Sequence, residues 1–281
     1  FLLKKDINDT TTKSIGVKIM QEIGWINGAW GTMDELTISI NDRGLNYGDG
    51  IFETILIREN QIKLLQPHLN RWERSAAKLG MNTPPSELVI RSIINEGLKS
   101  PILGNGIGAL RLNWSRGRNK NRGINYAKTD FNKYSFWIVL TSVAPSFDTI
   151  STRIDNIERR NANSIISQCK TLNYLQSIQA RLSAHKENYD DALLLSTTGE
   201  MCCGTTANII VERNGEFITP RLASGCLPGI MRYQGIRKGL FKEVSLSPKP
   251  EANDKWLLIN SLNCHPIAKI NRQVLKIFEH P

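Results

Sequence analysis

The sequence predicts a mixed α+β protein in two halves, and three of its segments carry that prediction. Residues 51–58 alternate in hydropathy and are rich in β-branched side chains, which is typical of a strand. Residues 67–79 place Leu69, Trp72 and Ala76 on one face of a helix. The stretch 144–148 contains Pro145 and no periodic apolar pattern, so it is the best candidate for a boundary between the halves.

The first half is predicted to be a domain at residues 23–143, preceded by a flexible polar extension at 1–22. Its expected elements, in chain order, are strands at 25–28, 36–40, 51–58 and 61–65, helices at 67–79 and 86–98, and a buried strand at 136–143. Gly80 ends the first of these helices, and Pro84 and Pro85 precede the second.

The second half is predicted to be a domain at residues 151–281, joined to the first by a linker at 144–150. Its expected elements are a helix at 174–187, strands at 191–196 and 208–213, a helix from 230 to about 240, and a final strand at 255–259. Pro228 and Gly229 mark the start of the second of these helices.

The composition is that of a globular protein, with 40% hydrophobic and 22% charged residues among 281. No run of 18 apolar residues is present, and Lys4 and Lys5 cut off the opening Phe-Leu-Leu, so neither a membrane span nor a signal peptide is predicted. Five irregularly spaced cysteines argue against a disulfide framework and against a zinc site. We therefore expect a cytoplasmic protein that binds no metal.

The formal net charge of +10 is concentrated in one stretch of the chain. Between Glu96 and Asp130 there are seven basic residues and no acidic one, and the rest of the chain has 29 basic against 26 acidic residues. Gly117, Asn119, Asn121 and Gly123 predict that the centre of this stretch is a flexible turn. The charge alone fits a solvated surface, a nucleic-acid contact or a loop over a small anionic ligand.

Two further segments could carry chemistry. Lys170 precedes a predicted helix; it is either a surface charge or, in an apolar pocket, a lysine that forms a Schiff base with a carbonyl cofactor. The glycine-bounded turn at 225–229 leads into a helix, so it is either an ordinary helix start or a site for a phosphate group. Arg71 could add a fixed charge to such a phosphate.

Taken together, these segments resemble one family. The matching residues, in chain order, are Asp-Arg-Gly-Leu-Asn-Tyr-Gly-Asp-Gly-Ile-Phe-Glu-Thr at 42–54, His-Leu-Asn-Arg at 68–71, Lys-Thr-Leu-Asn-Tyr at 170–174, Asn208, Thr219-Pro220 and Leu-Pro-Gly-Ile-Met-Arg at 227–232. This order is similar to that of the class IV aminotransferases, which are pyridoxal-phosphate enzymes of fold type IV. The family includes branched-chain aminotransferases, D-amino-acid aminotransferases and aminodeoxychorismate lyases.

The resemblance implies a small N-terminal α/β domain and a larger, barrel-like C-terminal domain, with pyridoxal 5'-phosphate between them, in a homodimer. It implies that Lys170 is the catalytic residue, which forms the Schiff base with the cofactor and moves the proton at the substrate's Cα. Further cofactor-binding positions are Arg71, Ile230, Met231 and Ser261 around the phosphate, and Asn173 and Asn208 near the cofactor.

The sequence departs from the family at Cys203. The family has a glutamate five residues before the asparagine matched to Asn208, and that carboxylate keeps the cofactor's pyridine nitrogen protonated. A neutral thiol can only hydrogen-bond the unprotonated nitrogen, so we expect Cys203 to favour elimination over transamination or to mark loss of cofactor function. Glu200 could take the place of the family glutamate only if the alignment were shifted by three residues. The alternative for Cys203 is that it is a small buried residue with no role at the cofactor.

Among the family members, the blocks at 49–52, 170–173 and 260–262 are most similar to the aminodeoxychorismate lyases. That resemblance implies elimination of pyruvate from 4-amino-4-deoxychorismate to give p-aminobenzoate for folate synthesis, with Arg116 or Arg122 binding a substrate carboxylate. A branched-chain or D-amino-acid aminotransferase is the first alternative, and a catalytically impaired cofactor-binding protein is the second. A nucleic-acid or membrane partner is not expected.

Overall fold

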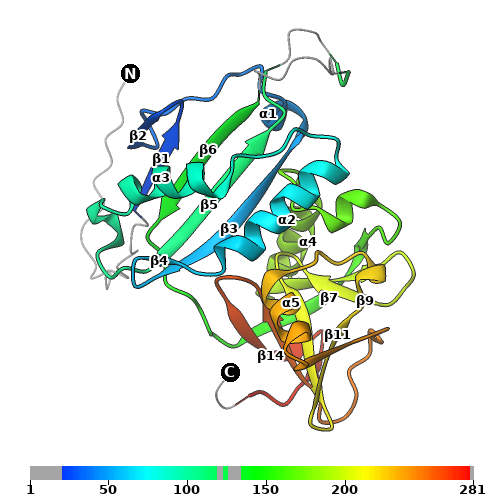
Figure 1. The fold of residues 1–281 in the computed structure, drawn as a ribbon. Helices are drawn as coiled ribbons and strands as arrows, with labels where there is room; N and C mark the ends of the chain where they lie inside the picture. The colour runs from blue at the N-terminus through cyan, green and yellow to red at the C-terminus, as the bar shows by residue number, and fades with distance from the viewer. Residues whose placement is uncertain (1–20, 119–122, 126–133, 279–281) are drawn as a thin grey trace, which may run out of the picture.

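Two β-sheets form the framework of the protein, which was analysed as a computed structural model describing residues 21–118, 123–125 and 134–278 (Figure 1). All strands of the six-stranded sheet lie between Glu22 and Thr141, and all strands of the nine-stranded sheet lie between Ile150 and Val274. Residues 142–149 contain no helix or strand and connect the two sheets. The division of the chain into domains stays a prediction, and its extension at 1–22 falls largely outside the described residues.

The first sheet is antiparallel throughout, in the order β2-β1-β6-β5-β3-β4. Its strands are β1 (Glu22–Ile26), β2 (Ala29–Thr32), β3 (Gly50–Arg58), β4 (Gln61–Ile62), β5 (Gly108–Ser115) and β6 (Ser135–Thr141). Its helices are α1 (Arg43–Tyr47), α2 (Leu65–Lys78) and α3 (Glu87–Gly97), followed by the 3₁₀ turn η1 (Pro101–Leu103).

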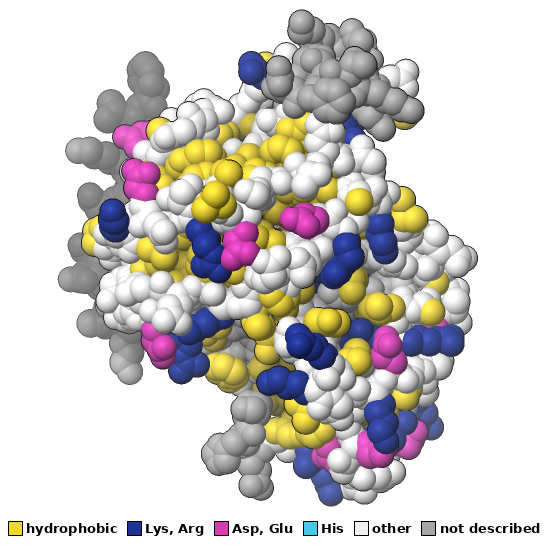
Figure 2. Space-filling view, in the orientation of Figure 1, with side chains coloured by type: hydrophobic (Ala, Val, Ile, Leu, Met, Phe, Trp, Pro, Cys, Tyr) yellow, Lys and Arg dark blue, Asp and Glu magenta, His cyan; other side chains and the backbone are white. Residues whose placement is uncertain are grey.

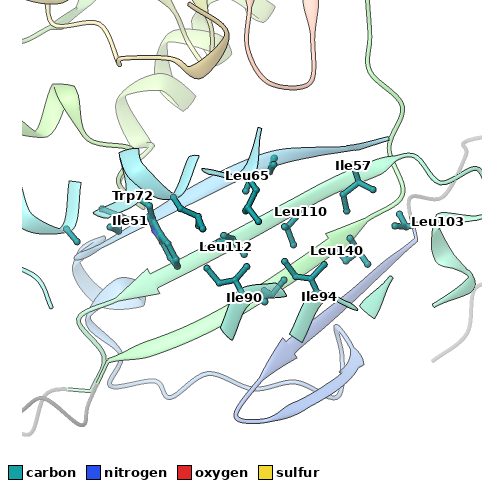
Figure 3. Packing of buried hydrophobic residues seen from close by; sticks show 14 of the residues in the cluster. Ile51, Ile57, Leu65, Trp72, Ile90, Ile94, Leu103, Leu110, Leu112 and Leu140 are labelled. Carbon is teal, nitrogen blue, oxygen red and sulfur yellow. The ribbon is translucent and has the colours of Figure 1, made fainter. Parts of the chain in front are cut away.

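Helices α2 and α3 cover one face of this sheet (Figure 1). Helix α2 presents a stripe of buried apolar side chains because Leu65, Leu69, Trp72 and Ala76 recur at intervals of three or four residues. Figure 3 shows Trp72 of α2 and Ile90 and Ile94 of α3 over the sheet residues Leu110, Leu112 and Leu140. Burial of these side chains fixes β3 and α2, the two elements that carry the first half of the site.

The second sheet closes into a ring. Its strands run in the order β12-β11-β10-β13-β14-β7-β8-β9, and β9 pairs again with β10 through Cys203 and Asn208. The strands are β7 (Ile150–Arg160), β8 (Asp191–Ser196), β9 (Met201–Gly204), β10 (Asn208–Arg213), β11 (Glu216–Pro220), β12 (Phe241–Val244), β13 (Lys255–Ile259), β14 (Cys264–Ile270) and β15 (Gln273–Val274). The ring therefore matches the barrel-like domain implied by the resemblance.

Two helices and two 3₁₀ turns accompany the ring. They are η3 (Ile165–Gln168), α4 (Leu175–Lys186), η4 (Leu222–Ser224) and α5 (Ile230–Arg237). Helix α4 packs on β7 and β8, and α5 packs beside β12. The mixed α+β class predicted from the sequence is thus confirmed, with the structural framework of fold type IV.

The structure corrects several predicted elements. Residues 36–40 form no strand, and the short helix α1 follows them instead, with the Asp42 side chain accepting a hydrogen bond from the Gly44 N–H. The predicted basic loop contains strand β5, so Arg111 lies in a sheet. Glu22 already belongs to β1 and Ile150 to β7, and the strand at 255–259 is followed by β14 and β15.

The visible surface does not gather the positive charge into one patch. Figure 2 shows Lys and Arg side chains scattered over this face and interspersed with Asp and Glu. Among the residues that the structure describes, no helix combines the length and the hydropathy needed to cross a bilayer.

Candidate active site

A cavity of about 730 Å³ lies between the two sheets. Phe52 and Thr54 of β3 and Arg111 of β5 line it from the first sheet, while Cys203 of β9 and Asn208 of β10 line it from the second. Its volume falls within the roughly 300–1,000 Å³ usual for small-ligand sites. The cavity is therefore large enough for a cofactor together with a small substrate.

The segment that carries Lys170 is fixed to strand β3 by its backbone. The Phe52 N–H donates to the Lys170 carbonyl at 2.9 Å, and the Leu172 N–H donates to the Gly50 carbonyl at 2.9 Å. A Cβ atom on Gly50 would lie 2.9 Å from the backbone carbonyl oxygen of Trp114, so the close packing at this point requires glycine. The position of Lys170 thus depends on the first sheet although the residue belongs to the second half of the chain.

The Lys170 side chain is half-buried and lines the cavity. Its Nζ donates to the Tyr174 hydroxyl oxygen at 2.9 Å and lies 4.2 Å from the centroid of the Phe52 ring. An ammonium group with one such partner keeps two N–H bonds for other contacts. Because Lys170 lines the cavity, its amine can meet a carbonyl group there, and it reacts with it once it has lost a proton.

Arg71, on helix α2, forms a two-pronged ion pair with Glu53 of β3. Arg71 Nε donates to Glu53 Oε1 at 2.8 Å and Nη2 donates to Oε2 at 2.5 Å, while Nη1 donates to the Pro228 carbonyl at 3.2 Å. Burial by itself would raise the pKa of Glu53, but the Arg71 charge and the hydrogen bonds from His68 and Arg71 outweigh it and lower that pKa to about 2. These three bonds leave two of the five guanidinium N–H groups for an anion.

The start of helix α5 borders the same part of the cavity. Asn208 Nδ2 donates to the Leu227 carbonyl at 2.9 Å, and a Cβ atom on Gly229 would lie 1.9 Å from Asn208 Oδ1. The first helical bond runs from the Tyr233 N–H to the Gly229 carbonyl, so the N–H groups of Ile230 and Met231 have no partner within the helix. Such N–H groups, with the helix dipole, attract an anion.

Ser261 lies in the turn between β13 and β14 and faces this anion site. Its Oγ is 3.2 Å from Nε2 of the buried His68, whose Nδ1 is 2.7 Å from Glu53 Oε2. The fold thus brings four predicted phosphate-binding positions, Arg71, Ile230, Met231 and Ser261, to one cavity. Their role at a phosphate stays a proposal.

Cys203 stands at the point where the ring of strands closes, opposite Asn208 in the β9–β10 pair. It is 8% exposed and lines the cavity, whereas Glu200 points elsewhere and forms an ion pair with Arg221 at 3.0 Å. Asn173 lies exposed at the rim. Among the described residues that line the cavity there is no aspartate or glutamate, and there are five basic residues, namely Arg71, Arg111, Arg159, Arg160 and Lys170.

Of the two arginines predicted to bind substrate, only Arg116 lies among the described residues. Arg116 does not line the cavity: its Nε is 3.1 Å from Asp49 Oδ2, and its Nη atoms donate to the Leu79 and Gly80 carbonyls. Arg122 lies outside the described residues. The structure therefore gives Arg116 partners outside the cavity, and a role for Arg122 at the substrate stays a prediction.

Arg111 is one of the five basic residues that line the cavity, and sequence reasoning did not single it out. Its guanidinium carbon lies 3.7 Å from the Phe52 ring centroid, and its Nε donates to Asn113 Oδ1 at 2.8 Å. Burial lowers the pKa of Arg111, partly opposed by Tyr174. The alternation of small, apolar and polar residues at 108–115 indicated a strand, and that pattern could have identified Arg111 as a residue on a defined sheet face.

The ring of strands and the cavity between the two sheets, with Lys170 in its lining, have the architecture of fold type IV. Residues 50–270 match the family model described as "Amino-transferase class IV". The chain therefore belongs to the class IV aminotransferase family, whose cofactor is pyridoxal 5'-phosphate.

Named relatives of the chain span more than one reaction. It is 26% identical to the branched-chain-amino-acid aminotransferase-like protein 2 of Arabidopsis thaliana over 90% of this chain, and it spans only 46% of that relative's length. It is 23% identical to the aminodeoxychorismate lyase of Bacillus subtilis, over 88% of this chain and 86% of that protein. The pyridoxal-phosphate-bound hypothetical aminotransferase of Mycobacterium tuberculosis matches with a TM-score of 0.77 at 20% identity, covering 92% of this chain and 94% of that one.

The cavity residues fit the cofactor chemically. A phosphate needs fixed N–H donors, and the free edge of Arg71 and the α5 N-terminus supply them. An aldehyde needs an amine, and Lys170 supplies one 2.9 Å from the Tyr174 hydroxyl. Glycine at 229 lets the start of α5 pack closely on Asn208, because a Cβ atom there would lie 1.9 Å from Asn208 Oδ1.

Proposed function

We propose that this protein is a pyridoxal-phosphate-dependent lyase that eliminates pyruvate from 4-amino-4-deoxychorismate to give p-aminobenzoate. The observation that carries the proposal is the cavity itself, whose described lining has a lysine and four arginines and no carboxylate; Arg71 among them is paired with the Glu53 carboxylate, which does not line the cavity. That charge suits a phosphate together with a dicarboxylate substrate. The test is a substrate panel, in which aminodeoxychorismate should have a higher kcat/KM than leucine or D-alanine supplied with a keto acid.

Each step of this reaction has a candidate group in the chain. When bound, pyridoxal phosphate withdraws electrons from the substrate carbon that carries the amino group. Lys170 would hold the cofactor's carbonyl carbon until the substrate's amino group takes its place, and the released amine could then accept the proton from that substrate carbon. Arg71, Ser261 and the N–H groups of Ile230 and Met231 hold the phosphate. Loss of pyruvate leaves an aromatic ring, whose stability supplies much of the driving force.

Arg111 is proposed to bind a substrate carboxylate. Stacking on Phe52 and the bond to Asn113 fix its guanidinium toward the cavity, and the planar fork suits a carboxylate. Arg111→Gln should raise the KM for aminodeoxychorismate by about 10- to 150-fold, because a hydrogen bond to a charged group contributes about 1.5–3 kcal/mol. Steady-state kinetics check this, with Arg111→Lys intermediate; an unchanged KM for Arg111→Gln would exclude this role.

Cys203 is proposed to determine which reaction the cofactor supports. Since no described carboxylate lines the cavity, none is available to keep the pyridine nitrogen protonated. An opposite charge within about 4–6 Å shifts a pKa by roughly 1–3 units, so Cys203→Glu should raise the protonated fraction about tenfold or more. We expect Cys203→Glu to convert more of the cofactor to pyridoxamine phosphate per p-aminobenzoate formed.

The control for this change is Cys202→Ser. Cys202 is the fully buried neighbour of Cys203 and does not line the cavity. It should leave the ratio of pyridoxamine phosphate to p-aminobenzoate as in the wild type. The electronic role of Cys203 is wrong if Cys203→Glu and the wild type give the same ratio.

The second candidate function is amino transfer from branched-chain or D-amino acids. The similarity to an aminotransferase-like relative favours it, as do the apolar cavity residues Ile166, Leu172 and Leu262. In that case turnover requires a keto acid as the amino acceptor. A role in folate synthesis follows from the lyase assignment. A homodimer is proposed from the family resemblance, and a cytoplasmic location from the cysteine pattern of the sequence.

A further inference from the structure

A chain of three hydrogen-bonding groups lies behind the proposed phosphate site. Glu53 Oε2 is 2.7 Å from His68 Nδ1, and His68 Nε2 is 3.2 Å from Ser261 Oγ. His68 is 1% exposed and does not line the cavity, whereas Ser261 does. A change in the hydrogen bonding of the Ser261 hydroxyl therefore alters the hydrogen bond of an almost completely buried histidine.

The hydrogen atoms along this chain follow from the chemistry of its members. Glu53 is ionised and can only accept, so His68 Nδ1 must carry a hydrogen. Burial lowers the pKa of His68 and outweighs the attraction of Glu53, so the ring is neutral and Nε2 is a bare acceptor. The Ser261 hydroxyl hydrogen consequently points to Nε2 and away from the cavity.

A bound phosphate requires a different arrangement. Its oxygens only accept hydrogen bonds, so Ser261 can serve it only by turning its single hydrogen toward the cavity. His68 Nε2 would then face the lone pairs of Ser261 Oγ, and that contact is favourable only if Nε2 carries a hydrogen. The Nδ1 hydrogen cannot move to Nε2, because Nδ1 would then face the Glu53 carboxylate bare.

We propose that His68 takes up one proton from solvent when the cofactor's phosphate binds, while Ser261 turns its hydroxyl hydrogen from His68 Nε2 to the phosphate. A new N–H bond forms at Nε2, and the resulting cation lies between Glu53 and the anion. This inference rests on the phosphate site of the proposed function. His68 is thus a positioning residue that acts on the cofactor through Ser261.

The charges around His68 explain why binding and protonation are linked. Glu53 of β3 favours the protonated form of the His68 ring. Arg71, which lies on helix α2 with His68, and Lys170, which precedes α4, oppose protonation. A phosphate monoester brings a charge of about −1.5 to −2 and offsets those two cations. Without a ligand the surrounding groups therefore favour the neutral His68 ring, and with the anion bound they favour the protonated ring.

The test counts protons during binding of 4-deoxypyridoxine 5'-phosphate, a cofactor analogue without the aldehyde, so that Lys170 forms no bond to it. Calorimetric titrations near pH 7.5, in buffers of different ionisation enthalpy, should show net uptake of up to one proton per site, since the second pKa of a phosphate monoester is about 6. Affinity should rise up to about tenfold for each pH unit lowered. His68→Gln should bind without uptake, whereas His185→Gln, at an exposed position on α4, should behave as the wild type.

If His68→Gln fails to fold, the ring nitrogen signals of the wild-type histidines, followed by NMR with and without the analogue, decide the same point. One histidine should change from the neutral to the doubly protonated form on binding. Binding without proton uptake, or with uptake retained in His68→Gln, overturns the proposal for His68 alone. Failure of the analogue to bind, or binding unaffected by Arg71→Gln, overturns the phosphate site and the proposal that rests on it.

Discussion

Lys170→Ala is expected to abolish both the visible absorbance band of the protein-bound cofactor and the formation of p-aminobenzoate. The variant loses the amine that holds the cofactor and the base that accepts the substrate proton. Proton transfer by a positioned group alone contributes about 10²–10⁴-fold, so the combined loss in kcat should be at least about 10⁴-fold. Absorbance after reconstitution and a product assay measure the two effects separately.

The Lys170→Ala protein should still fold, because the backbone of this segment, not its side chain, is bonded to β3. Lys186→Ala, at the exposed end of α4, is the matched control and should retain band and activity. A visible band that persists in Lys170→Ala would mean that another group holds the cofactor.

Glu53→Gln is expected to cause the largest loss of stability among single changes near the site. The carboxylate bridges Arg71 and His68 and is almost fully buried. Removing one partner of a buried ion pair leaves the other charge uncompensated and costs about 3–5 kcal/mol in the free energy of unfolding. Denaturant unfolding of the cofactor-free protein measures this loss.

The stability of Glu53→Gln should depend less on pH in the acid range than the stability of the wild type. Because the folded protein lowers the pKa of Glu53 from 4.5 to about 2, its contribution to stability is present above pH 4.5 and is lost as the pH falls toward 2. The Gln variant should lack that part of the acid dependence. Glu59→Gln, at an exposed surface pair with Lys63, should change stability by no more than about 0.5 kcal/mol. Equal free energies of unfolding for Glu53→Gln and Glu59→Gln would contradict a stabilising role of the Glu53–Arg71–His68 network.

Those parts of the fold that have strong local periodicity could be predicted from the sequence. Helix α2 and strand β3 were predicted to within two residues because each has one apolar face at its own repeat. Strand β7 was missed because its residues, Ile-Ser-Thr-Arg-Ile-Asp-Asn-Ile-Glu-Arg-Arg, are mostly polar and charged. Strand β14 contains Pro266, which local rules count against a strand.

The candidate site was predictable where neighbouring residues in the sequence form a motif. Lys170, Arg71, Ser261, Asn208 and Cys203 all line the cavity, although their roles stay proposals. The choice between Arg111 and Arg116 depends on the folded structure, because Arg111 lies in β5 and lines the cavity, whereas Arg116 follows the strand and bonds to Asp49 and to the Leu79 and Gly80 carbonyls. The Glu53–His68–Ser261 chain joins β3, α2 and the β13–β14 turn, so only the folded structure brings it together.

The central claim is tested most directly by measuring p-aminobenzoate and pyruvate together when the reconstituted protein acts on aminodeoxychorismate alone. A lyase that uses Lys170 should release the two products in equal amounts, and adding a keto acid should not change the rate. A requirement for a keto acid, or neither product in a preparation that has the visible cofactor band, would contradict the claim.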